Sequence, residues 1–167
     1  KNFISLFLAI NKMAEKYDMP ILYSCHPRSR NRLAASGFQL DPRVIQHEPL
    51  GFHDYNCLQM NAFAVVSDSG TLPEESSFFT SVGHPFPAIC IRTSTERPEA
   101  IDKGDFIIAG IDEKSLLQAV DTAVELCQNG QHGIPVPDYS DENVSTKVVK
   151  IVQSYVGIVN KMVWRKF

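Results

Sequence analysis

The chain has 167 residues, of which 44% are apolar and 21% are charged. These proportions are typical of a single globular domain that buries one core without disulfides or a structural metal. The formal net charge is -3 and the basic residues are mostly scattered, which argues against nucleic acid as a partner. The four cysteines lie more than thirty residues apart, so they form no zinc or dithiol motif, and we expect reduced thiols in or near the core.

The chain opens directly on a helical pattern. Apolar residues recur at helical spacing and predict an amphipathic helix over residues 3–17. Because this pattern starts without an initiator Met, we expect a fragment whose upstream part is missing. No signal-peptide pattern is present and no apolar run approaches the roughly twenty residues that span a bilayer, so we expect a cytoplasmic protein without a membrane partner.

Short apolar runs then alternate with segments of helical length or pattern. Strands that alternate with helices indicate an α/β fold, here a Rossmann-like parallel sheet with helices on both faces. A second amphipathic helix is predicted over Glu113–Gln128 and a last long helix over residues 144–163. The predicted strands are Pro20–Ser24, Val44–His47, Phe63–Ser67, Pro87–Ile91 and Phe106–Ala109.

Ligands of open α/β sheets bind beyond the carboxyl ends of the strands. The third predicted strand runs into the sequence VVSDSGTLPEE, where Gly70 allows a sharp turn and Pro73 suits the first turn of a helix beginning near residue 72. The free amides and positive dipole end of such a helix bind phosphate, and Ser69 adds a hydroxyl donor. Alternatively, Ser69 or Thr71 only caps the helix and its first-turn acids complement the dipole.

The fourth predicted strand ends in RTSTERPEA, a second hydroxyl-rich segment with a proline that suits a helix start. Arg97 in this segment either binds phosphate in a bidentate way or pairs with Glu96 or Glu74. His26 follows the first strand and either donates a hydrogen bond, transfers a proton or is structural. The other histidines lack the spacing of a metal pair, so we predict neither a metal nor a cofactor.

Three segments together resemble a known family. SDSGTLPEE, then RTSTERPEA, with ILYSCHPRSR upstream, is similar in order and spacing to the signature of the non-hydrolysing UDP-N-acetylglucosamine 2-epimerases. The variants Thr71 and CHPRSR resemble most the capsule and O-antigen branch that makes UDP-N-acetyl-L-fucosamine (UDP-FucNAc). The resemblance implies the carboxyl-terminal half of a GT-B fold, like that of UDP-glycosyltransferases and glycogen phosphorylase, over residues 1–167. The amino-terminal catalytic domain would be absent from this chain.

The resemblance also implies roles for individual residues. Ser69 and Gly70 match the positions that hold the diphosphate, and Glu75 matches the glutamate that binds the ribose hydroxyls. His26 matches a histidine needed for activity. The remaining matches are Arg97, which lies in the same pocket, and Tyr55, or less closely Phe52, which lies near the uracil.

The implied reaction eliminates UDP across C1 and C2 of the sugar, returns a proton to the opposite face of C2 and re-adds UDP. The proton-transfer carboxylates would lie in the absent domain, and the full-length enzyme is expected to be a homodimer. This isolated chain is then expected to bind UDP weakly without turnover. Two other functions stay open at this point, namely the nucleotide-binding half of a GT-B glycosyltransferase and a non-catalytic UDP-binding module.

Overall fold

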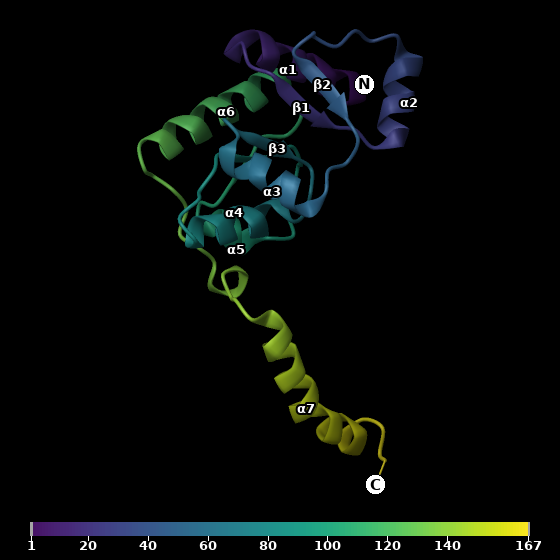
Figure 1. Ribbon diagram of the computed structural model, residues 1–167, viewed down its shortest axis with the longest axis vertical. Helices are drawn as coiled ribbons and strands as arrows, with labels where there is room; N and C mark the ends of the chain where they lie inside the picture. Colours follow the sequence, from purple (N-terminus) through teal and green to yellow (C-terminus); the bar gives the residue numbers. More distant parts are fainter. Residues whose placement is uncertain (1, 167) are drawn as a thin grey trace.

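The structure is a computed structural model that describes residues 2–166, and its helices and strands alternate along most of the chain (Figure 1). The five strands and the three helices with predicted bounds match the expected ones to within two residues at each end. The helices are α1 Asn2–Tyr17, α2 Pro27–Ser36, α3 Phe52–Asn61, α4 Leu72–Ser81, α5 Pro98–Asp102, α6 Glu113–Gln128, the short 3₁₀ helix η1 Pro137–Tyr139 and α7 Val144–Met162. The strands are β1 Ile21–Ser24, β2 Val44–His47, β3 Val65–Ser67, β4 Ala88–Cys90 and β5 Ile107–Ile108.

The five strands form two parallel sheets instead of the single sheet that the alternating pattern predicts. One sheet has the order β1-β2, with Ile21 opposite Val44, and the other has the order β3-β4-β5, with Val65 opposite Ala88. Every pairing is parallel, as crossover helices require. The break falls between β1 and β3, which belong to different sheets.

Two hydrophobic clusters lie on opposite sides of the second sheet, and β4 contributes to both. Ile89 belongs to the cluster built mainly from α1 and α6, whereas Ala88 and Cys90 belong to the cluster with α4, α5 and η1. This division follows from the alternation of side chains along a strand. The expected architecture, a parallel sheet with helices on both faces, is therefore confirmed for this part of the molecule.

Local sequence signals fix several helix ends. Asp112 caps α6, since its carboxylate accepts a hydrogen bond from the Ser115 amide at 3.2 Å. Gly37 ends α2 in the left-handed conformation at φ 66°, which glycine adopts without steric cost. Pro73 lies in the first turn of α4, as expected from its missing N–H.

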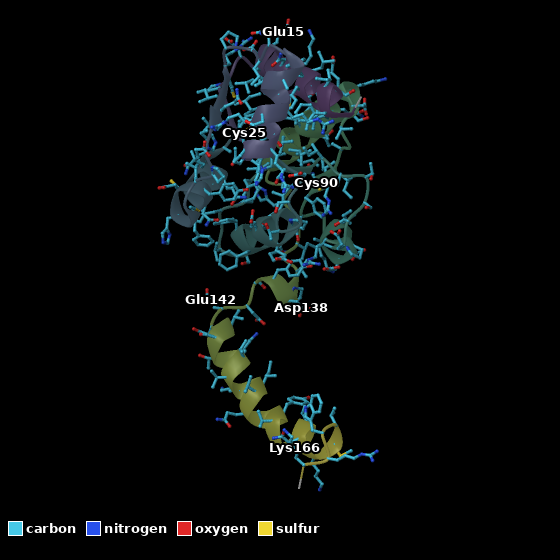
Figure 2. The ribbon with its side chains drawn as sticks, turned by 90° about the vertical axis from the view of Figure 1, so that its right-hand side faces the viewer. Glu15, Cys25, Cys90, Asp138, Glu142 and Lys166 are labelled. Carbon is cyan, nitrogen blue, oxygen red and sulfur yellow. The ribbon has the colours of Figure 1, made fainter. Side chains whose placement is uncertain are left out.

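The last helix, α7, extends away from the rest of the molecule, as the two views show (Figures 1 and 2). Its residues are exposed apart from two half-buried positions near its carboxyl end. Among these exposed residues are many large apolar side chains: Val144, Val148, Val149, Ile151, Val152, Tyr155, Val156, Ile158 and Met162. The long helix itself is confirmed, but the described part of this chain does not cover its apolar side chains. Across residues 2–166, no helix is both long and apolar enough to cross a bilayer.

Candidate functional site

The turn after β3 is held together by its own hydroxyl groups. The Ser67 hydroxyl accepts the amide of Ser69 at 3.0 Å, and the Ser69 hydroxyl accepts the amide of Thr71 at 3.2 Å. Ser69 Oγ and Thr71 Oγ1 lie 2.8 Å apart in a further hydrogen bond. Ser67 thus stabilises the turn through its hydroxyl, whereas Asp68 is exposed.

The first turn of α4 carries two acids and no side-chain cap. Thr71 occupies the N-cap position but makes no capping hydrogen bond. Its hydroxyl donates instead to Glu75 Oε1 at 2.8 Å, so Ser69 must be the donor in the hydroxyl pair. The capping alternative is therefore wrong for the Thr71 side chain, and the start of α4 keeps its capacity to bind an anion.

Gly70 lies exposed between these hydroxyls. It is absent from the described glycines with positive φ, so the turn does not demand glycine for its backbone angles. A Cβ atom at this position would lie 3.6 Å from Arg92 Nη1, an ordinary contact. The sharp-turn interpretation is thus not supported, and the close approach of a ligand to the Gly70 backbone stays a prediction.

Glu75 is held from a second side by α3. Gln59 Nε2 donates to Glu75 Oε2 at 2.6 Å and to the Tyr55 hydroxyl at 3.2 Å. Burial, followed by the negative charge of Glu75, raises the pKa of Tyr55. Phe52, the less favoured candidate for the uracil contact, is 77% exposed and lies outside this network. We call the connected residues Tyr55, Gln59, Ser69, Thr71 and Glu75 the polar corner.

Arg97 lies beside the polar corner and adopts the ion pair that the sequence left open. Its Nε and Nη2 atoms lie 2.7 and 2.6 Å from Glu74 Oε1, and this carboxylate raises the pKa of Arg97. Glu96, the other candidate partner, instead makes a two-point ion pair with Arg92 at 2.8 and 3.0 Å. Because Glu74 precedes Glu75 in α4, the pairing places Arg97 at the same helix start.

His26 caps α2 at the end of β1. Its Nδ1 accepts the Arg28 amide at 3.3 Å, so a neutral ring carries its proton on Nε2 and offers that N–H as a donor. Among the residues that the structure describes, no hydrogen bond joins His26 to the polar corner.

Asp68, which follows β3, acts electrostatically on two residues of other strands. Burial raises the pKa of Tyr23 to about 12, and the negative charge of Asp68 adds to this shift. The pKa of Cys90 on β4 is raised by burial and, to a smaller extent, also by Asp68. The charge of Asp68 is therefore felt at both β1 and β4.

The cysteines and hollows lie apart from this chemistry. Cys25 and Cys90 are buried and Cys127 is half-buried, but Cys57 is exposed, so the expectation of core or near-core thiols is wrong for Cys57. In the described part of the chain, no group of three or more His, Cys, Asp or Glu side chains is placed to hold a metal ion. Two hollows, of about 50 and 330 Å³, are lined by residues that include Asp105 and Ile107 and by none of the predicted site residues.

The fold is shared with known proteins. Residues 1–153 match the family described as UDP-N-acetylglucosamine 2-epimerase. The chain belongs to this family. An epimerase-family relative from Methanococcus maripaludis, named UDP-N-acetylglucosamine 2-epimerase, is 30% identical over 152 residues, which is 88% of this chain and 38% of the relative. A relative of the same name from Bacillus subtilis is 31% identical over 68% of this chain and 29% of its own length.

Solved structures agree. The UDP-N-acetylglucosamine 2-epimerase of Rickettsia bellii matches with a TM-score of 0.86 and 36% identity, over 99% of this chain and 44% of that one. The Methanocaldococcus jannaschii UDP-GlcNAc 2-epimerase, solved in complex with UDP-GlcNAc and UDP, matches with a TM-score of 0.77. At 24% identity and 41% coverage of that chain, it supports the GT-B-like fold alone. This epimerase-family chain thus spans less than half the length of these relatives.

The sequence did not identify Gln59 as a residue of the candidate site. Its spacing of four residues from Tyr55 places both on one face of α3, a signal that was available. Its hydrogen bond to Glu75 joins residues 16 positions apart and depends on how α3 lies beside the start of α4.

Proposed function

We propose that this chain, residues 1–167, is the UDP-binding carboxyl-terminal domain of a two-domain UDP-HexNAc 2-epimerase. The observation that carries the proposal is the polar corner. Its hydroxyls, its uncapped helix start and its fixed carboxylate lie together where a parallel strand ends, in a chain of this family. A relative that binds UDP-GlcNAc and UDP has the same fold.

In this proposal the domain holds the leaving group. When the C1–O bond of the sugar breaks, the electron pair departs with UDP and negative charge grows on the diphosphate. The Gly70 backbone and the first amides of α4 stabilise that charge, and rotation of the Ser69 hydroxyl toward the phosphate adds a donor. Glu75 accepts hydrogen bonds from the ribose hydroxyls, and Tyr55 lies against the uracil.

Arg97 and His26 act on the same diphosphate in this proposal. Nε and Nη2 of Arg97 are engaged by Glu74, and Nη1 donates to the Glu96 backbone oxygen at 3.3 Å. The remaining N–H groups of the five-donor guanidinium are left for phosphate. His26 contributes its Nε2–H. The groups that remove and return the C2 proton belong to the amino-terminal domain, so the chain alone binds UDP weakly and turns over nothing.

The proposed second domain accounts for two surfaces of this chain. The large apolar side chains of α7 are exposed along most of its length. A polar corner at the surface is also what one half of a site shared by two domains presents. We extend the proposal to a cytoplasmic homodimer of the full-length protein, and to UDP-FucNAc for capsule or O-antigen synthesis as its product, on the strength of Thr71 and the CHPRSR segment.

Calorimetry with UDP tests the ribose contact. Glu75→Gln keeps the shape of the side chain and removes its charge, and hydrogen bonds to charged groups contribute about 1.5–3 kcal/mol. We expect UDP affinity to fall roughly 10- to 100-fold. Glu113→Gln, in the first turn of α6, is the matched control and should leave affinity unchanged. Equal affinities for wild type and Glu75→Gln would reject the ribose assignment.

Heavy water tests the reaction in the full-length protein. An epimerase that works through C2 deprotonation places deuterium at C2 of its nucleotide sugar without any acceptor. Incubation with UDP-FucNAc and, separately, with UDP-GlcNAc distinguishes the proposed product from the commoner family substrate. Sugar transfer to an acceptor without C2 exchange would instead identify a glycosyltransferase, and UDP binding with neither reaction would identify a binding module.

A further inference from the structure

Gln59 is a buried polar residue whose amide nitrogen is hydrogen-bonded and whose amide oxygen is not. It is 2% exposed, and its Nε2 donates to both Glu75 and Tyr55. Its Oε1 is also buried and finds no hydrogen-bond partner in residues 2–166. An unpaired buried acceptor costs about 1–3 kcal/mol, so the residue is not placed there for stability alone.

The orientation of the carboxamide is dictated by Glu75. Turning the amide over would bring Oε1 to within hydrogen-bond distance of Glu75 Oε2, and two acceptors would then face each other. The donor is thus kept toward the carboxylate at the cost of the orphaned oxygen. A position that conflicts with local stability in this way is typical of a functional site.

The consequence is a carboxylate held at both oxygens. Gln59 donates to Glu75 Oε2 and Thr71 donates to Oε1, which fixes the plane of the group. Each oxygen keeps a further lone pair for an incoming hydroxyl. Gln59 is the stronger restraint, because water competes with the exposed Thr71 hydroxyl but does not reach the buried amide.

We propose that Gln59 is a positioning residue that orients Glu75 toward the two vicinal hydroxyls of a ribose, and that it gives the site its preference for ribonucleotides over 2′-deoxyribonucleotides. This inference rests on the proposed function, since it assumes that Glu75 binds the ribose of UDP. It goes further in assigning the sugar selectivity to a residue that does not itself touch the ligand.

The test compares UDP with 2′-deoxy-UDP by calorimetry on wild type and Gln59→Met. Methionine fills a similar volume without a donor or a buried acceptor. We expect UDP affinity to fall about tenfold, 2′-deoxy-UDP affinity to change less than twofold, and the melting temperature to stay level or rise. Gln118→Met on the exposed face of α6 is the matched control and should change neither affinity.

A purely structural role for Gln59 predicts the reverse pattern, with a lower melting temperature and equal losses for both nucleotides. That result would overturn the inference. If Gln59→Met does not fold, Gln59→Asn is used, because it keeps the amide but cannot reach Glu75. In a Glu75→Ala background, replacing Gln59 should no longer change the ratio of the two affinities, and an undiminished change would also overturn the inference.

The two proposals fail in different ways. If wild type does not bind UDP, the proposed function is lost. If wild type binds UDP and Glu75→Gln weakens it while Gln59→Met keeps the wild-type ratio, only the positioning role is lost.

Discussion

The polar corner and a second polar site that also involves α4 differ in which buried oxygens lack hydrogen-bond partners. We call Asp105, Ser76, Ser77, Gly133 and Val136 the buried acid site. Within residues 2–166, both sites contain side-chain oxygens without hydrogen-bond partners, namely Oε1 of Gln59 and both carboxyl oxygens of Asp105. In the polar corner the unpaired oxygen belongs to the neutral amide of Gln59, whose Nε2 donates a hydrogen bond to the Glu75 carboxylate. In the buried acid site the orphans belong to the acid itself.

The buried acid site joins three segments of the chain. Ser76 Oγ donates to the Asp105 backbone oxygen at 2.6 Å, and Ser77 Oγ accepts the Val136 amide at 2.7 Å. Asp105 is 6% exposed, and burial raises the pKa of its carboxyl, an effect that the nearby Ser77 hydroxyl only partly offsets. Under the proposed function the corner serves ligand binding, whereas the buried acid site packs three segments together and carries a charge that burial disfavours.

The glycine of the buried acid site gives the largest expected effect. A Cβ atom on Gly133 would lie 2.4 Å from Asp105 Oδ1 and 2.8 Å from the Asp105 backbone, so the main chain must move. We expect Gly133→Ala to lower the free energy of unfolding by about 3 kcal/mol, the upper range for overpacking. Urea denaturation measures this change as a shift of the midpoint.

Gly157→Ala is the matched control for Gly133. Residue 157 lies in α7 with nothing within 4 Å of an added Cβ, so alanine there should stabilise slightly or leave the midpoint unchanged. Equal midpoints for Gly133→Ala and wild type would mean that the loop is loose and that the buried acid site is not tightly packed.

The charge of Asp105 gives a smaller effect with the opposite sign. Asparagine keeps the shape and removes the charge, so we expect Asp105→Asn to raise the free energy of unfolding at pH 7 by about 2 kcal/mol. Burial raises the pKa of the Asp105 carboxyl in the folded state above its ordinary value of 3.8. The stability that the protonated carboxyl contributes is therefore full below about pH 4 and is lost as pH rises through the folded pKa. The advantage of Asp105→Asn should therefore shrink as pH falls toward 4.

Thermal unfolding of both proteins between pH 4 and pH 8 checks this dependence, and UDP affinity should not change. An asparagine variant that is less stable than wild type at every pH would show that the carboxylate has a favourable partner. The contrast between the two sites would then disappear.

The sequence predicted individual elements better than the connections between them. The bounds of α6 follow from its apolar period, its cap at Asp112 and the Asn129-Gly130 end, all of which are local. The split of the strands into two sheets was not predicted, because alternation along the chain does not say which strand edges meet. The exposed apolar side of α7 was likewise not predicted, since a period reveals an apolar face but not what covers it.

The same limit applies to the candidate site. The sequence identified a candidate site at Ser69, Gly70 and Glu75, because the end of a strand and the start of a helix are both recognisable from neighbouring residues there. Their partners could not be located, because Gln59 reaches Glu75 only through the placement of α3. For Arg97 the sequence predicted either phosphate binding or an ion pair with Glu96 or Glu74, and in the structure the guanidinium pairs with Glu74.

Gly70, which lies between Ser69 and Thr71 of the polar corner, gives the smallest effect on the fold and the sharpest contrast with Gly133. The backbone angles at residue 70 do not require glycine, and an added methyl group would make only an ordinary contact with Arg92. We expect Gly70→Ala to change the free energy of unfolding by less than about 0.5 kcal/mol. It should nevertheless weaken UDP binding about tenfold, because the methyl group separates the backbone amides from the phosphate oxygens. Calorimetry and thermal unfolding on one preparation measure both quantities.

Gly51→Ala, at the start of α3, is the matched control, since its Cβ would also make an ordinary contact at 3.8 Å. Equal UDP affinity for Gly70→Ala and Gly51→Ala would remove the diphosphate from this turn and leave the polar corner without its distinguishing role.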